Sequence, residues 1–355
     1  MTRVVFITQR FDPGDPNLAI VVPQVAAIAR RVDEVVVVAD TVEAGSLPPN
    51  ARAHSFRSKT KLGRGLRLLV IVARELPGLR RGGAVVAHMC PVYAIVVAPL
   101  VRPARVPLVM WWSHWKMDAV VRTAERVCTR VVSVAPGTFP HPSAKLVTVG
   151  QAIDVGSFPE RTGERAEGPL RAVVIGRYSP AKGIGTVLRA LKLATDRGVD
   201  LELEVYGPAA NAEARAERDA LQALVEELAL GERARLHGAV SRGEVIRLLG
   251  AADVLVNNAP GGADRVVYEA GASGIPVLAS NRAHADFLAP DAFFDRGDAE
   301  ELARRLEALA ALPAAARDQI GRRLRERVAR ENSVDSWAAG LLAAAGITGH
   351  LDELD

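Results

Sequence analysis

Two cations flank a short turn near the middle of the sequence. Arg177 and Lys182 lie five positions apart in the stretch 172–183, which reads AVVIGRYSPAKG. The stretch begins as an apolar run typical of a buried strand, and a helical pattern starts near Ile184. A helix N-terminus offers unpaired N–H groups and a partial positive charge. Two cations beside it therefore suit a ligand with two negative charges, such as a diphosphate.

This arrangement of Gly-Arg-x-x-x-x-Lys-Gly after a buried strand resembles the donor-phosphate motif of the retaining glycosyltransferases of family 4. That family has the GT-B fold of two facing Rossmann-like domains. The resemblance implies that Arg177 and Lys182 neutralise the pyrophosphate of a sugar nucleotide and stabilise the leaving diphosphate, with Gly176 and Gly183 at the same site. Taken alone, the motif would by default be interpreted as two surface cations at the start of a helix.

A second resemblance lies in the stretch 252–277. Gly261 and Glu269 lie eight positions apart, where the family has two glutamates around a glycine-containing loop. The comparison implies that Glu269 accepts hydrogen bonds from the ribose hydroxyls, a role that suits an acceptor-only carboxylate. It also implies that the loop Gly261, Gly262, Ala263 and Asp264 presents backbone N–H groups to the sugar. Asp264 either replaces the missing first glutamate or is an ordinary loop or N-cap residue, and both readings stay open.

The first half of the chain carries weaker marks. His114 follows a predicted strand and is similar to a family histidine that faces the donor sugar, with a structural histidine as the alternative. His88 also ends a predicted strand and is either structural or turned toward the acceptor. In the first loop, 9–19, Leu18 and Ala19 stand where the family has a glycine pair, which leaves a phosphate contact from this side open.

The elements that position these residues follow an alternating pattern. Short runs rich in Val and Ile alternate with amphipathic stretches of helical length, which predicts parallel sheets covered by helices. The predicted strands are 4–8, 34–39, 84–88, 108–112, 131–134 and 146–149, and then 172–176, 201–206, 234–237, 254–257 and 276–279. We therefore expect two Rossmann-like, doubly wound α/β domains, 1–158 and 170–332, joined by the polar stretch 159–169, with a helix at 333–347 that returns to the first domain as in the family.

Composition narrows the class of protein further. The 355 residues suit two domains, and 49% hydrophobic with 24% charged residues is ordinary for a globular protein. Two cysteines, no signal-peptide pattern and no apolar run near the roughly 20 residues of a membrane span predict a cytoplasmic protein. Few aromatic residues and no recognition motif argue against nucleic acid. No zinc-spaced Cys/His cluster or Asp-x-Asp pair is found, which predicts a metal-independent protein without a cofactor.

The stretch 57–81 is strongly basic. Glu75 is its only acid, and an apolar run, 68–73, lies at its centre. Such a segment is either an amphipathic helix bound at an anionic membrane surface or a solvated basic helix over a hydrophobic core.

Together these features predict a retaining glycosyltransferase of bacterial glycan or glycoconjugate biosynthesis. It would move a sugar from a UDP-, GDP- or other nucleoside-diphosphate donor to an acceptor hydroxyl, and catalysis would be mainly electrostatic. The basic stretch 57–81 suggests a lipid-linked acceptor and a location at the inner face of the membrane. Two alternatives remain. Gly261 and the altered first loop would suit a non-catalytic binding protein of the same fold, and a sugar-nucleotide epimerase would share the fold.

Overall fold

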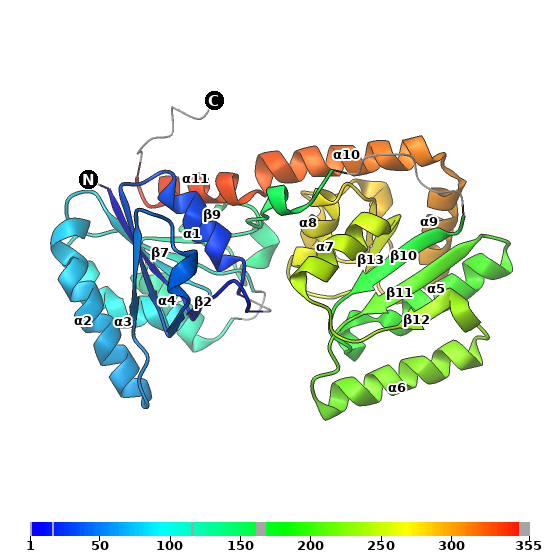
Figure 1. Ribbon diagram of the computed structural model, residues 1–355, viewed down its shortest axis with the longest axis horizontal. Helices are drawn as coiled ribbons and strands as arrows, with labels where there is room; N and C mark the ends of the chain where they lie inside the picture. The colour runs from blue at the N-terminus through cyan, green and yellow to red at the C-terminus, as the bar shows by residue number, and fades with distance from the viewer. Residues whose placement is uncertain (1, 16–17, 115–116, 161–167, 348–355) are drawn as a thin grey trace. The chain divides into compact units, whose positions relative to one another are not determined.

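The chain forms two α/β units, which the computed structural model describes over residues 2–15, 18–114, 117–160 and 168–347. The first unit comprises Met1–Asp154 and Glu331–Asp355, and the second comprises Val155–Arg330 (Figure 1). The boundaries expected from the sequence were residues 158 and 170. Of the predicted linker, residues 161–167 lie outside the described residues.

The first unit is built on a parallel sheet. Its strands are β1 (Arg3–Ile7), β3 (Glu34–Ala39), β5 (Ala51–Ser55), β6 (Ala84–His88), β7 (Leu108–Trp111), β8 (Arg130–Ser133) and β9 (Leu146–Thr148). In the described part of the unit they are ordered β5-β3-β1-β6-β7-β8-β9. Side chains of alternate residues point to opposite faces. Val5 and Ile7 share one core with α2 (Lys61–Leu79), α3 (Pro91–Val101) and α4 (Ala119–Val127), whereas Phe6 faces the helices α1 (Val21–Ala29) and α11 (Val334–Ala344).

The second unit repeats this plan on a smaller parallel sheet. The strands β10 (Leu170–Ile175), β11 (Leu201–Tyr206), β12 (Ala234–Leu236), β13 (Val254–Asn257) and β14 (Val277–Ala279) are ordered β12-β11-β10-β13-β14. One face packs on α5 (Ile184–Asp196), α6 (Ala212–Glu227) and α9 (Ala299–Ala311), and the other on α7 (Arg242–Ala251) and α8 (Arg265–Ala272), with α10 (Ala314–Glu331) following α9. Helices on both faces of parallel sheets confirm the doubly wound α/β fold expected from the sequence.

The sequence did not predict β5 or the short parallel pair of β2 (Arg10–Phe11) and β4 (Thr41–Val42). β5 reads ARAHS, lies at the edge of the sheet, and has no fully buried residue. An edge strand of this kind lacks the alternation of buried and exposed residues that identifies a strand in a sequence.

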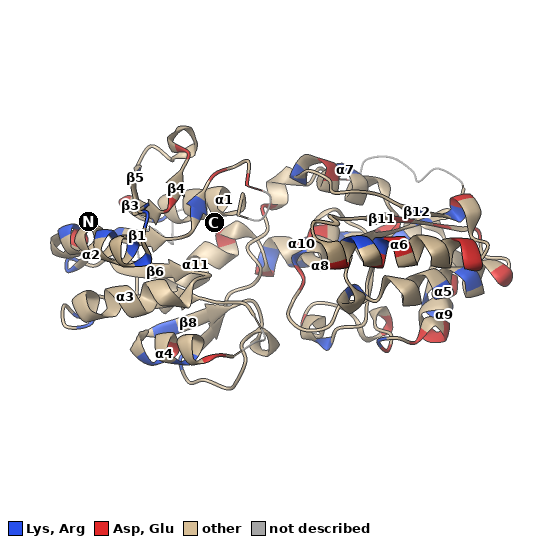
Figure 2. Cartoon of the chain, turned by 90° about the horizontal axis from the view of Figure 1, so that it is seen from below, with Lys and Arg blue, Asp and Glu red and all other residues tan. Residues whose placement is uncertain are grey.

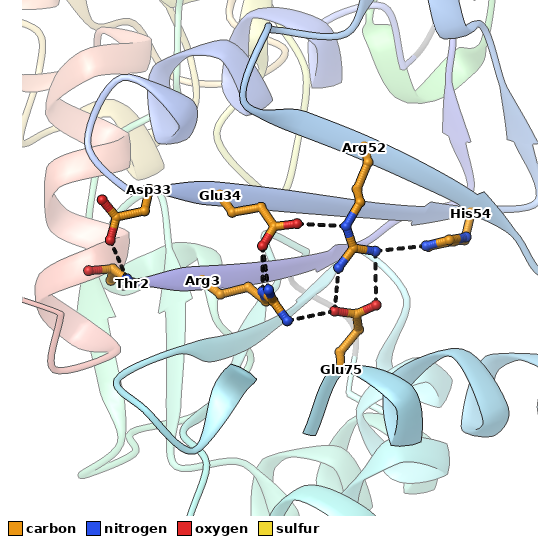
Figure 3. Close-up of polar contacts among 7 residues, drawn as sticks. All are labelled: Thr2, Arg3, Asp33, Glu34, Arg52, His54 and Glu75. Atoms are coloured by element: carbon orange, nitrogen blue, oxygen red, sulfur yellow. Dashed lines mark hydrogen bonds and ion pairs between the residues drawn. The ribbon is translucent and has the colours of Figure 1, made fainter. Parts of the chain in front are cut away.

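An ion-pair network joins the amino ends of three strands to α2 (Figure 3). Arg52 of β5 donates to Glu34 of β3 at 2.6 Å and to Glu75 of α2 at 2.9 Å, and Arg3 of β1 donates to the same two carboxylates. Burial favours the neutral form of the nearly buried Glu75, but the hydrogen bonds and positive charge of Arg52 outweigh it and lower the pKa of this carboxyl. The only acid of the basic stretch therefore faces the sheet.

The outer surface of α2 is unusual. Leu68, Val72 and Leu79 pack into the core, as a solvated basic helix would require. The opposite side, however, carries Leu62, Leu66 and Val70, whose exposed fractions are 75%, 55% and 50%. These three residues, four positions apart, form one stripe along the helix, which we call the outer stripe. Lys61, Arg64, Arg67 and Arg74 add positive charge to the same helix (Figure 2). Among the described helices, none is long and apolar enough to cross a membrane.

The end of the described chain belongs to the first unit. Trp337 of α11 is fully buried, with its ring 6.5 Å from that of Phe6 and 5.7 Å from that of Trp111. Asp335 accepts hydrogen bonds from Arg30 and Arg31 at 2.7 and 2.8 Å. The aromatic packing and the ion pairs fix α11 beside α1.

Candidate functional site

The turn between β10 and α5 forms the centre of the candidate site. After β10 ends at Ile175, a short 3₁₀ turn, η4 (Pro180–Lys182), leads into α5. The N-cap of α5 is Gly183, which has no side chain to accept from the first N–H groups of the helix. These donors and the helix dipole favour an anion at this point.

Both glycines of the motif have a local structural role. Gly183 has φ 57°, in the left-handed region, and a Cβ there would lie 2.4 Å from Nδ2 of Asn258. That amide donates a hydrogen bond to the Gly183 carbonyl at 2.9 Å. A Cβ on Gly176 would lie 3.3 Å from Cε of Lys182, so the lysine side chain passes close to this glycine. The left-handed backbone and the close Asn258 amide favour glycine at 183, and a side chain at 176 would come into contact with Lys182.

Lys182 and Asp264 are brought together. The lysine Nζ lies 2.5 Å from Oδ2 of Asp264, which also accepts from Asn257 Nδ2 at 3.0 Å. Asp264 occupies the N-cap position of α8, but its side chain makes no capping hydrogen bond. Its carboxylate therefore serves Lys182 and not the helix end. Arg177 is exposed and has no hydrogen-bond or ion-pair partner among the residues that the structure describes.

The glycine loop before α8 is held through its carbonyl groups. Gly261 has φ 95°, and Nδ2 of Asn281 donates to the carbonyls of Gly261 and Gly262 at 2.5 and 2.9 Å. A Cβ on Gly262 would meet nothing within 4 Å, and Ala263 already carries one. The left-handed backbone at Gly261 therefore matters more than space does in this loop.

Glu269 is buried in α8, with 4% of its surface exposed, and it accepts from Nη1 of Arg242 at 2.5 Å. Arg242 lies over the ring of Phe158, and its Nη2 is buried without a hydrogen-bond partner among the described residues. A capping box of Ser241 and Glu244 begins α7 and places Arg242 in its first turn. Sequence reasoning missed Arg242, because nothing in the local sequence connects it to Glu269.

Sequence reasoning also missed a buried histidine near Lys182 and Asp264. His284 ends the short turn η6 (Arg282–His284), is fully buried, and has no hydrogen-bond partner at either ring nitrogen within the described residues. Burial lowers its pKa to about 4; the Asp264 carboxylate opposes this shift and the Lys182 ammonium adds to it. The ring is therefore neutral at physiological pH. Asn257 and Asn258 could have been predicted. They lie at the carboxyl end of the predicted strand 254–257, where the site residues of α/β sheets are expected.

In the first unit, His114 is exposed, with its ring 5.9 Å from that of Trp112. His88 is buried and its Nδ1 lies 3.1 Å from the hydroxyl of Thr8, as expected of a structural histidine. In the first loop, the N–H of Gly14 donates to Asp12, which forms a turn, and residues 16–17 lie outside the described residues. No three His, Cys, Asp or Glu side chains of the described chain gather in a way that could hold a metal ion.

Comparison with known families identifies part of the chain. Residues 159–327 match the family model for glycosyl transferases group 1, a range that covers most of the second unit. No curated protein matches the chain by sequence.

Solved structures resemble the whole chain. The Anabaena protein HepE, solved in complex with UDP, is 16% identical, with a TM-score of 0.74 over 97% of this chain and 99% of that one. Sucrose-phosphate synthase from Thermosynechococcus elongatus is 16% identical, with a TM-score of 0.69 over 96% and 97%. A glycosyltransferase from Rickettsia africae is 12% identical, with a TM-score of 0.71 over 97% of both chains. The chain therefore has the GT-B fold of glycosyltransferases, and its second unit carries the match to glycosyl transferases group 1.

Proposed function

We propose that this protein transfers a sugar from a nucleoside-diphosphate donor to an acceptor hydroxyl, with retention at the anomeric carbon and without a metal ion. The observation that carries the proposal is the β10–α5 turn, which contains Arg177 and Lys182 and leads into an uncapped helix N-terminus. The match to glycosyl transferases group 1 and the UDP bound by HepE, a protein of the same fold, support it. We place the reaction in bacterial glycan or glycoconjugate biosynthesis.

The diphosphate would lie over the N-terminus of α5. Lys182 is held by Asp264 through one of its N–H donors, which leaves two for phosphate oxygens. Arg177, which has no other partner in the described chain, would supply a second cation. Both charges and the helix dipole attract the β-phosphate more strongly as charge grows on it during bond cleavage. In a front-face reaction this leaving phosphate accepts the proton of the acceptor hydroxyl, and the protein supplies no base.

The nucleoside and the sugar would be held by the loops around α8. Glu269 would accept from the ribose hydroxyls, with Arg242 fixing its carboxylate. The loop Gly261 to Asp264 would face the transferred sugar, and His114 remains the candidate for a sugar contact from the first unit. If Glu269 binds the ribose, the Glu269→Ala variant should bind nucleoside diphosphates more weakly than the wild-type protein.

We further propose that the protein works in the cytoplasm at the inner face of the membrane. The outer stripe of α2 and its basic neighbours support this location, because apolar side chains can enter the interface while cations meet anionic lipids. A lipid-linked acceptor would be found there.

One experiment tests the reaction and its stereochemistry. The purified protein is incubated with a panel of UDP-, GDP- and dTDP-sugars, and nucleoside diphosphate release and thermal stabilisation are measured. We expect one nucleotide class to be hydrolysed slowly and to raise the melting temperature, with the released sugar first appearing as the anomer of the donor by NMR. If no nucleotide binds, the proposal is wrong. Binding without any turnover in the presence of membrane extracts would instead indicate a non-catalytic protein.

A further inference from the structure

A cavity of about 510 Å³ opens at the carboxyl edge of the first unit's sheet. Four of its lining residues lie at the carboxyl ends of neighbouring strands: Asp40 and Phe56 directly follow β3 and β5, Cys90 lies two residues after β6, and Arg10 lies three residues after β1, in β2. From β1 the chain proceeds to β3 and β5 on one side, and from β6 to β7, β8 and β9 on the other. Ligands of open α/β sheets bind where the strand order reverses in this way.

One side of the cavity is cationic. Lys61 and Arg64, from the first turns of α2, both line it. Nε of Arg64 donates to the Ser58 carbonyl at 3.1 Å and lies 3.7 Å from the Asp40 carboxylate, too far for a hydrogen bond. Neither the Nη groups of Arg64 nor the ammonium of Lys61 has a hydrogen-bond partner in the described part of the chain. Arg64 thus forms an ion pair with Asp40 through Nε, while its Nη groups and the ammonium of Lys61 can still donate to an anionic group.

The other side is apolar and aromatic. Phe56 and Tyr93 pack edge to face with their centroids 5.5 Å apart, and Leu68 and Val96 extend this wall. Val92 also lines the cavity and is 47% exposed, so the apolar wall continues to the surface. A ligand that fits here has a charged head for the cations and a hydrocarbon part for the wall.

We propose that this cavity binds an acceptor that is an amphiphilic phosphate, with its phosphate on Lys61 and Arg64 and its hydrocarbon chain along Phe56, Tyr93 and Val92. Its role as an acceptor rests on the proposed glycosyl transfer. A single phosphate between a lysine and an arginine makes charge-assisted hydrogen bonds that a neutral headgroup cannot make. The outer stripe lies on the same helix as the two cations, which suits a protein that meets such molecules at a membrane.

Calorimetric titration of the full chain with decyl phosphate, below its critical micelle concentration, tests the site. Decanol and inorganic phosphate are titrated separately, so that each half of the ligand is measured alone. We expect one molecule of decyl phosphate per chain, and for either half alone an affinity weaker by about tenfold or more, the change that one charge-assisted hydrogen bond produces. Equal binding of inorganic phosphate would reduce the site to an anion site and overturn the proposal.

Three variants locate the ligand. Lys61→Gln with Arg64→Gln should weaken decyl phosphate by about tenfold or more, whereas Arg74→Gln, which removes an exposed charge later in α2, should not. Gly65→Leu should abolish binding, because Gly65 lines the cavity and a Cβ there meets nothing within 4 Å. Leucine also favours the helix more than glycine does, so folding should be retained.

The nucleotide titration keeps the two proposals separate. UDP or GDP affinity, measured on the same samples, reports on the second unit alone. Unchanged nucleotide binding with no decyl phosphate binding would overturn this inference and leave the transferase proposal standing. If Arg74→Gln weakens decyl phosphate binding as much as the Lys61/Arg64 variant does, the ligand is attracted to α2 non-specifically. That result would also overturn this inference.

Discussion

Lys182 is an ion-paired residue, and this changes what its removal should do. Its ammonium is fixed by Asp264, which is itself held by Asn257. A cation fixed in place loses little freedom when a phosphate arrives, so its hydrogen bonds are available to the transition state without reorganisation. The ion pair also means that truncating the lysine leaves a carboxylate beside the expected diphosphate.

We predict that Lys182→Ala lowers kcat by about 10²–10³-fold, as the loss of one preorganised donor to developing charge does elsewhere. Steady-state kinetics with the nucleotide class found above provides the measurement. Arg189→Gln, which removes an exposed cation further along α5, is the matched control and should retain full activity. A Lys182→Ala enzyme as fast as this control would show that the β10–α5 turn does not bind the leaving group.

The neutral histidine in the second unit should make stability depend on pH. His284 has a pKa of about 4 in the folded chain, against about 6.5 when unfolded. Between these pH values the unfolded state binds more protons than the folded state. The free energy of unfolding is therefore highest above about pH 6.5 and decreases as pH falls toward 4. The loss should approach about 3 kcal/mol. Urea unfolding from pH 7 to 4 measures it, and His284→Phe should flatten the curve. A curve that keeps its slope in the variant would assign the effect to other groups.

At the residue scale, the sequence predicted only part of the candidate site. Arg177 and Lys182 could be found because strand, turn and helix are consecutive in the chain. Arg242 and His284 could not, because they approach Glu269 and Asp264 only after α7 and η6 have packed onto the sheet. The open question about Asp264 was settled only in part. Its carboxylate does not cap α8, and a sugar contact remains a prediction.

Among the elements, α2 carries the prediction about the membrane. Replacing Leu62, Leu66 and Val70 by serine should abolish flotation with anionic liposomes, because the three exposed side chains would no longer enter the interface. Arg67→Gln with Arg74→Gln should weaken flotation and its dependence on salt, since each basic residue near such a surface contributes about 1 kcal/mol. Wild-type protein that stays in solution with anionic and neutral liposomes alike would contradict the proposed location.

Glu75, on the inner side of α2, should make the stability of the first unit depend on pH. Glu75→Gln removes the carboxylate shared by Arg3 and Arg52 and should destabilise the first unit by about 1–2 kcal/mol, a value reduced because Arg52 is partly solvated. Since the pKa of Glu75 is lowered by folding, its stabilisation is present above the unfolded value, about 4.3, and is lost as pH falls below it. Denaturation of both proteins between pH 7 and 3 should show their stabilities converging. A constant difference down to pH 3 would exclude this role.

The strands predicted from the sequence appear in the structure with ends shifted by no more than about two residues, the usual uncertainty at element ends. Runs such as Glu34–Ala39 are detected because both faces of a central parallel strand are buried. β5 was missed because its stability comes from pairing with β3 and from the Arg52 ion pairs, neither of which leaves an apolar pattern.

For the whole molecule, the return of the chain to the first unit should be measurable. Trp337→Ala should destabilise that unit by about 3–5 kcal/mol, because α11 loses the fully buried aromatic side chain that packs on β1 and β7. In differential scanning calorimetry, a transition that UDP or GDP raises reports on the second unit. We expect Trp337→Ala to lower the other transition and leave this one in place. A shift of the nucleotide-sensitive transition instead would place the effect of α11 in the second unit.

The GT-B fold was predictable at this scale because it follows from alternating elements repeated in two series, which local patterns reveal. The amphiphilic phosphate that we propose as the acceptor was not, because the basic stretch 57–81 suggested only a lipid-linked acceptor. The cavity of the first unit combines residues from positions 9 to 96, and Lys61 and Arg64 come from a helix whose charge alone suits a solvated surface equally well. Only the fold shows which of those cations lie beside an apolar wall.

The chain leaves the first unit after Asp154 and returns to it after Arg330, and these two points are hydrogen-bonded to each other. Ile153 forms a parallel bridge with Ser333, and the backbone N–H of Gln151 donates to Asn332. The entire second unit is thus inserted between two neighbouring points of the first. Such an insertion can be exchanged as a cassette: grafting residues 155–330 of a relative with another nucleotide preference would require only two junctions and would leave the first unit's sheet, its cavity and α11 unaltered. Hybrid enzymes of this kind would recombine the donor and acceptor preferences that we propose for the two units.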